Sequence, residues 1–230
     1  INLNFYNYKK MPHNLYDNLH ELANILPRQK FRKATLAYFI HQHALKYGDF
    51  TFASGIKSNN KFDLELLPAD AYDLAADILV DIIGEDKPDM VFGIPNGGVP
   101  IAERVAARLK VPQISTYKEE NQPLVRRDSY VGTGVAYGFE DAITTGGSTL
   151  RTIEPVQQYA GERGHSIIVP RAFAVIRRME STPEELLSPC GTGLSYIFTT
   201  RELLGWLMLL YERRLIELDS RWNEMWIPNL

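Results

Sequence analysis

The sequence predicts an α/β fold: a doubly wound, mostly parallel sheet flanked by helices, with a small N-terminal hood that contains a hairpin. From residue 69 onward, helical patterns of roughly 10–15 residues alternate with short apolar runs, which is typical of parallel strands joined by helical crossovers. Before residue 67, two segments alternate apolar and polar residues, as in a half-buried hairpin. We expect an arm, helix and hairpin over residues 1–66, an α/β core over 67–204 and a helical tail over 205–230.

The N-terminal region combines an arm, one helix and two strands. Residues 1–27 are rich in Asn and Tyr, and we expect a variable arm. Apolar residues recur near helical spacing over residues 28–47 and stop at Gly48, which predicts a helix. The strands of the hairpin are expected at residues 49–54 and 61–66.

In the core, each helix has an apolar face and each strand is a short apolar run. Leu74, Ile78 and Ile82 share one face of the first helix, for example. Residues 118–133 are polar and without period, so we expect a long loop there. Pro155 lies within the last expected helix, where a proline removes a hydrogen bond and produces a kink. Helices are expected at residues 69–83, 99–110 and 147–163, and strands at 89–94, 113–116, 134–141 and 166–176.

The composition is that of an ordinary globular protein. With 25 Lys and Arg against 28 Asp and Glu and 45% hydrophobic residues, neither disorder nor nucleic-acid binding is indicated. A single cysteine excludes a disulfide framework and a multi-cysteine metal site. The longest apolar run, residues 203–211, is far shorter than the roughly 20 residues of a membrane span. The first twenty residues lack the apolar segment of a signal peptide, and we expect a cytoplasmic protein.

One segment combines two acids with a glycine-rich turn. A predicted strand delivers Glu140 and Asp141, and the chain then enters a turn that opens a helix. Glycines let backbone N–H groups converge at a helix N-terminus, which favours a phosphate dianion. The carboxylates suit sugar hydroxyls or a developing positive charge, so the segment predicts a site for a phosphorylated ribose. The turn residues are Thr144, Thr145, Gly146, Gly147 and Ser148.

Two familiar nucleotide signatures are absent. The sequence has no G-x-x-x-x-G-K-[ST] segment, so this is not a P-loop protein. Gly132 and Gly134 lack the third glycine of a dinucleotide fingerprint, and they precede a strand instead of following one. The predicted phosphate site is therefore of another kind.

The segment from Glu140 to Ser148 resembles the signature of the type I phosphoribosyltransferases: an apolar strand, two acids and a turn of Thr, Gly and Ser residues. In that family the signature binds 5-phosphoribosyl-1-diphosphate (PRPP). The resemblance implies that Glu140 and Asp141 contact the ribose 2- and 3-hydroxyls. It also implies that residues 144–148 hold the 5-phosphate.

Further segments are similar to the orotate phosphoribosyltransferases, and the resemblance covers residues 47–204. Residues 47–58 look like the family's N-terminal hairpin, where a lysine lies near PRPP, which points to Lys57. Residues 89–102 resemble the diphosphate-binding turn, and residues 195–204 the last strand and terminal helix. The resemblance assigns the remaining binding residues as follows: Asn96, Gly97 and Gly98 to diphosphate, and Arg178 (or Arg177) with Thr144 to orotate.

The sequence departs from the family at two places. The family's mobile catalytic loop has a second lysine and a histidine where Asn121 and Pro123 stand, so its cations here are Lys118, Arg126 and Arg127. The hairpin has Asn59 and Asn60 where the family has an aromatic pair. The tail beyond residue 204, with Trp206, Trp222 and Trp226, matches no known pattern and suggests helical packing or a dimer contact.

The resemblance implies phosphoribosyl transfer from PRPP to orotate, giving orotidine 5′-monophosphate and diphosphate in pyrimidine biosynthesis. It also implies Mg²⁺, held mainly by PRPP and water with no direct protein ligand, and a homodimer whose catalytic groups are Glu140, Asp141 and the loop cations. Neither nucleic acid nor membrane is an expected partner. Two alternatives remain: transfer to another nucleobase, and a non-catalytic PRPP-binding regulatory protein.

Overall fold

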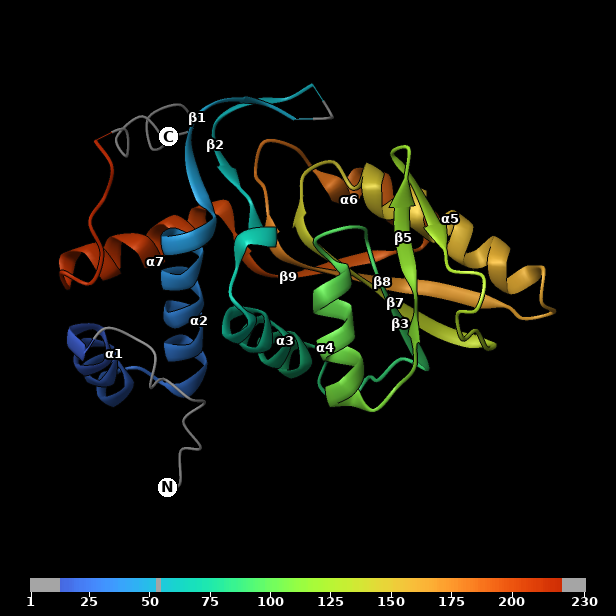
Figure 1. Ribbon diagram of the computed structural model, residues 1–230, viewed down its shortest axis with the longest axis horizontal. Coiled ribbons are helices and arrows are strands. Elements are labelled where there is room, and N and C mark those ends of the chain that lie inside the picture. Colours follow the sequence, from blue (N-terminus) through green and yellow to red (C-terminus); the bar gives the residue numbers. More distant parts are fainter. Residues whose placement is uncertain (1–12, 53–54, 221–230) are drawn as a thin grey trace.

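The computed structural model describes residues 13–52 and 55–220. At its centre is a five-stranded sheet in the order β4-β3-β7-β8-β9, in which every neighbouring pair is parallel. This confirms the predicted doubly wound sheet (Figure 1). The strands are β3 (Met90–Gly93), β4 (Gln113–Ile114), β7 (Gly134–Ile143), β8 (Ile167–Arg177) and β9 (Gly193–Thr199).

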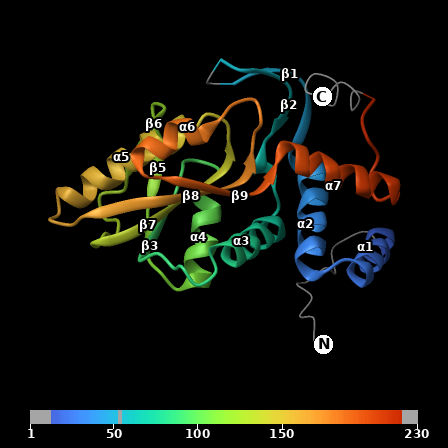
Figure 2. The same ribbon diagram turned by 180° about the vertical axis from the view of Figure 1, so that it is seen from behind.

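Helices cover both faces of this sheet, as the two opposite views show (Figure 1, Figure 2). Alternate residues of a strand point to opposite faces, so Val91 joins the larger core cluster and its neighbour Phe92 joins a second one. The larger cluster includes residues of α3 and α4, and the second includes residues of α5. Their bounds are α3 (Ala69–Ile83), α4 (Val99–Leu109) and α5 (Gly147–Gly161), and α5 continues past Pro155.

The N-terminal region holds two helices and the hood hairpin. The expectation of a variable arm over residues 1–27 is wrong for its second half, which forms a helix with Leu19 and Leu22 in the core. Residues 1–12 lie outside the described part. The elements are α1 (His13–Ile25), α2 (Arg28–Phe39), a π-helical turn (Ile40–Ala44), β1 (Leu45–Thr51), β2 (Lys57–Phe62) and a 3-10 turn (Leu64–Leu66).

The hood elements are shifted from their predicted positions. The helix predicted for residues 28–47 ends in the π-helical turn, because Leu45 is extended and starts β1. The hairpin is confirmed, but its second strand occupies residues 57–62 instead of 61–66. The mostly polar residues 57–62 pair with β1, and the apolar residues that follow them form the 3-10 turn. Residues 53–54, at the end of the predicted first strand, are not described.

The predicted long loop contains a second hairpin. Residues 116–119 and 122–125 pair as antiparallel strands, which corrects the expectation of a loop from residue 118. Glu120 and Asn121, between the strands, have φ values of 45° and 67°. Two left-handed residues are what a two-residue type I′ turn requires. The strands are β5 (Thr116–Glu119) and β6 (Gln122–Val125).

The C-terminal part closes the sheet edge. Helix α7 (Thr200–Glu212) begins with a reciprocal cap between Thr199 and Glu202, and the expected boundary at residue 204 falls inside it. Trp206 packs against the larger core cluster, whereas Trp222 and Trp226 lie outside the described residues. Two short elements precede β9: α6 (Pro183–Leu187) and a 3-10 turn (Ser188–Cys190). Within the described residues, no helix has the length and apolar character to span a membrane.

Candidate active site

The turn after β3 is pressed against the end of β7. The amide of Ile94 donates to the Phe139 carbonyl at 2.7 Å, which carries the strand pairing one residue beyond β3. A Cβ at Gly97 would overlap the Asp141 carboxylate, and one at Gly98 would lie 2.8 Å from the backbone of Ile94. Both glycines are therefore required for this close approach. Asn96 is exposed on the same turn, and its peptide bond with Pro95 is cis.

The two predicted acids face opposite sides of β7. Glu140 is buried and accepts a hydrogen bond from Thr149 Oγ1 at 2.5 Å, at the start of α5. Asp141 is half-buried beside Gly97 and accepts the Ala142 amide at 2.8 Å. Adjacent residues of a strand alternate in direction, so Glu140 faces the start of α5 and Asp141 faces the turn after β3.

Burial dominates the ionisation of both acids. It raises the pKa of Glu140 to about 8, because the Thr149 hydrogen bond compensates only in part and the Asp141 charge adds to the shift. Burial also raises the pKa of Asp141 to about 6, against the hydrogen bond from the Ala142 amide. Both carboxyls therefore hold protons more readily than exposed acids do.

The predicted phosphate nest lines a cavity of about 170 Å³. Gly146 precedes α5 with φ of +81°, a left-handed conformation that suits glycine, and its carbonyl accepts the Leu150 amide. The turn thus presents the first amides of α5 to the cavity. A larger hollow of about 460 Å³ between α2, α3 and β9 contains none of the motif residues. The nest cavity is lined by Phe52, Glu140, Ala142, Thr144, Thr145, Gly146, Gly147, Ser148 and Arg151.

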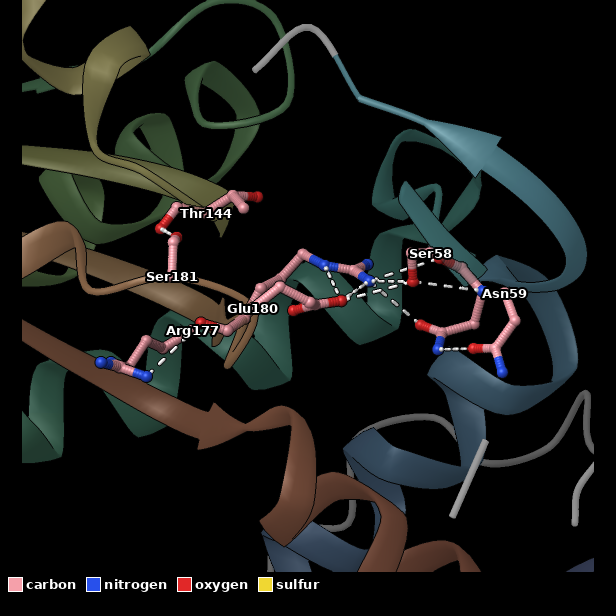
Figure 3. Close-up of polar contacts among 8 residues, drawn as sticks. Ser58, Asn59, Thr144, Arg177, Glu180 and Ser181 are labelled. Atoms are coloured by element: carbon pink, nitrogen blue, oxygen red, sulfur yellow. Dashed lines mark hydrogen bonds and ion pairs between the residues drawn. The ribbon is translucent and has the colours of Figure 1, made fainter. Parts of the chain in front are cut away.

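Arg178 connects the hood to the end of β8, where Ser58 of the hood and Glu180 lie close together (Figure 3). Its side chain is buried, with the guanidinium 4.4 Å from the Phe52 ring centre and 5.3 Å from that of Phe62. Its Nη2 donates to Ser58 Oγ at 2.9 Å, to Glu180 and to both side-chain and backbone oxygens of Asn60. The hood hairpin is thereby fixed beside the carboxyl end of the sheet.

The two charged neighbours of Arg178 have different partners: Glu180 pairs with Arg178, and Arg177 pairs with Glu184. Burial raises the pKa of Glu180, but the hydrogen bond and charge of Arg178 outweigh it, and the net shift is downward. Arg177 makes two bonds to Glu184 of α6, at 2.8 and 2.9 Å. Of the two arginines proposed for the base, Arg178 is therefore the one that lies on the hood side.

The predicted cations are not among the residues that line the nest cavity. Lys57 is exposed at the start of β2, and Lys118 is exposed on β5. The Arg126 guanidinium stacks over the Tyr117 ring at 5.4 Å. The Arg127 carbonyl accepts from Tyr159, twelve residues or about 18 Å along α5 from its start. None of these four side chains lines the cavity of this chain.

Three cavity residues were missed by sequence reasoning: Ala142, which lies between predicted residues, Arg151 and Phe52. Arg151 follows the glycine turn by one helical turn, and helical side chains point back towards the N-terminus, which was a usable signal. Phe52 comes from the hood, and no local pattern connects it to residues 140–151.

Comparisons with known proteins agree with this geometry, although no family model matches the chain. It is 32% identical over 149 residues to an orotate phosphoribosyltransferase of Sulfolobus acidocaldarius, covering 63% of this chain and 76% of that protein. The chain belongs to the orotate phosphoribosyltransferase family. A family member from Aeropyrum pernix is 29% identical over 172 residues, covering 71% of this chain and 89% of that one.

Solved structures of the family share the fold. The Aeropyrum pernix enzyme superposes with a TM-score of 0.61 at 29% identity, over 75% of this chain and 99% of that one. The Mycobacterium tuberculosis enzyme, solved with PRPP, superposes with a TM-score of 0.57 at 19% identity, over 75% of this chain and 98% of that one. The sheet described above is therefore the family's fold.

Gly147 offers a direct test of the nest. A Cβ there would lie 3.4 Å from Arg151 and 3.5 Å from Thr145, both cavity residues, so Gly147→Val should fill the cavity without disturbing the fold. We expect PRPP binding to be lost, as measured by calorimetry. Gly161→Val, in open space on the same helix, is the matched control. Gly146→Val is less suitable, because its positive φ and a contact 3.1 Å from Leu187 would strain the fold.

Glu140 should make stability depend on pH. Its pKa rises from 4.5 to about 8 on folding, so the folded state binds the extra proton, and stability falls as pH rises through this window. Glu140→Gln removes the titrating group and should raise the thermal midpoint, relative to the parent, more at pH 8.5 than at pH 5. Glu154→Gln, at an exposed position on α5, controls for the charge change. An equal shift at both pH values would contradict the role of burial.

Proposed function

We propose that this protein transfers the phosphoribosyl group of PRPP to orotate, giving orotidine 5′-monophosphate and diphosphate. The supporting observation is the continuous segment from Glu140 to Arg151, in which one strand end supplies both carboxylates and the following helix supplies the phosphate cavity. Membership of the orotate phosphoribosyltransferase family supports the choice of base.

The proposal assigns a separate group of residues to each of the three parts of PRPP. The 5-phosphate binds the amides and hydroxyls at residues 144–148. The ribose hydroxyls lie at Glu140 and Asp141. The diphosphate lies over Gly97 and Gly98, where the absence of side chains lets it approach the backbone.

The reaction breaks the bond between ribose C1 and the diphosphate oxygen and forms a bond from C1 to a ring nitrogen of orotate, whose proton passes to the released diphosphate. Positive charge develops on the ribose, and the fixed charge of ionised Asp141 stabilises it. The Asp141 pKa of about 6 means that this carboxylate is mostly ionised at neutral pH.

Magnesium fits the diphosphate side of the site. Mg²⁺ prefers oxygen ligands and retains water, and the Asp141 carboxylate lies beside Gly97 in this turn. When bound, Mg²⁺ would neutralise charge on the departing diphosphate. Within the described residues, no three His, Cys, Asp or Glu side chains are grouped as a metal site. In this proposal the ion is therefore held mainly by PRPP and water.

Arg178 and Thr144 form the proposed orotate site. The backbone amide of Arg178 donates to the carbonyl of Ile143, the residue before Thr144, at 2.8 Å. Arg178 and Thr144 therefore lie at the ends of adjacent strands. A guanidinium pairs well with the orotate carboxylate. Asn60, which stands where the family has an aromatic residue, contacts this guanidinium and supports the alternative of another base.

A base panel tests the function. With PRPP and Mg²⁺, diphosphate release should require orotate and not adenine, guanine, hypoxanthine or uracil. Asp141→Asn should lower turnover on the order of 10²-fold, because it removes the charge that faces the reacting ribose. Turnover with another base alone would reassign the substrate. PRPP binding without turnover would favour the regulatory alternative.

We further propose a homodimer in which β5 and β6 serve the partner's site. Lys118, Arg126 and Arg127 line no part of the nest cavity of their own chain, which supports delivery to a second subunit. An Asp141→Asn variant and a variant with all three cations changed to Ala should then complement each other. Subunit exchange should restore up to about a quarter of parental activity, because half the dimers are hybrid and half their sites are whole. No recovery in proven heterodimers would contradict delivery across the interface.

A further inference from the structure

Among the described residues that line the nest cavity, Arg151 is the only cation. It lies in the second turn of α5, and helical side chains point towards the N-terminus, so its guanidinium reaches the glycine turn. A Cβ on Gly147 would lie 3.4 Å from its Nη1, and its Nη2 lies 3.4 Å from Ser148 Oγ. The side chain thus lies beside the amides expected to meet a phosphate.

This position brings a second positive charge to a helix N-terminus. A helix N-terminus carries partial positive charge, and a cation there is repelled. Within residues 13–52 and 55–220, Arg151 makes no ion pair, unlike Arg177 and Arg178 at the neighbouring strand end. The buried Glu140 lines the same cavity and is bonded to Thr149; the charge of Arg151 lowers its pKa, but burial outweighs this and the net shift is upward. A dianionic ligand would remove the repulsion and use the guanidinium as a donor.

We propose that Arg151 binds the 5-phosphate of the substrate and makes the nest selective for a phosphorylated sugar. This inference deepens the proposed function and rests on it. The glycine turn supplies neutral amide donors, and Arg151 adds a full charge with a planar pair of N–H groups that matches phosphate oxygens. The residue contacts the phosphate and not the reacting atoms, so it is a binding residue.

Arg151→Gln tests the proposal by removing the charge and keeping an amide donor. Affinity for ribose 5-phosphate and for PRPP should fall by the same factor, on the order of tenfold or more, while affinity for diphosphate stays unchanged. Calorimetric titration of each ligand measures this. Arg151→Lys should recover part of the loss. Arg201→Gln removes an exposed arginine from the first turn of α7 and is the matched control.

The outcomes separate the two proposals. Unchanged ribose 5-phosphate affinity in a folded Arg151→Gln protein would overturn the role of Arg151, even if PRPP turnover is confirmed. An equal loss for diphosphate would also overturn it, since the effect would then be general attraction of anions. If the parent turns over no base, titration with inorganic phosphate still compares parent and variant at this cavity. Weaker phosphate binding by the variant would then support Arg151 alone.

Discussion

The parallel pairing of β3 with β7 is the constraint on which the site depends. The register sets Gly93 opposite Phe139, and the Ile94 amide extends the pairing one residue further. The strands then separate, and the turn folds over Asp141 with no room for side chains at Gly97. A slip of one residue would turn the carboxylate to the other face and separate it from the turn. This tightly packed backbone is therefore also the floor of the proposed diphosphate site.

The hood depends on a second, electrostatic constraint. Arg178 is buried between two aromatic rings and takes acceptors from a segment 118 to 120 residues away in sequence. Burying a guanidinium is costly unless it is paired and hydrogen-bonded; Glu180 pairs with Arg178, and oxygens of β2 accept from its Nη2. Displacing the hairpin would remove several of these acceptors at once. The hood and the strand ends are therefore stabilised as one unit.

Sequence reasoning predicted most of what is local. The bounds of α3 and the acid-and-glycine segment follow from periodicity and from backbone chemistry, and both are where they were expected. The β5–β6 hairpin was missed because its strands are polar and its turn lacks glycine. Helix α1 was also missed, although the helical spacing of the buried Leu19 and Leu22 was a signal for it. Phe52 and Arg151 line one cavity only because of tertiary packing, so no window of sequence contains this pairing of segments.

The β5–β6 hairpin has features that disfavour edge-to-edge pairing with strands of other molecules. A two-stranded ribbon leaves one edge of each strand open, and open edges recruit strands from other molecules. Pro123 lies opposite Lys118 and has no N–H, so it fits the ladder only where the missing donor faces outward. Lys118 and Glu119 add exposed charges on the other strand. The outer edge of β6 thus lacks a regular row of donors. This disfavours growth of the ribbon into an aggregated sheet at high protein concentration.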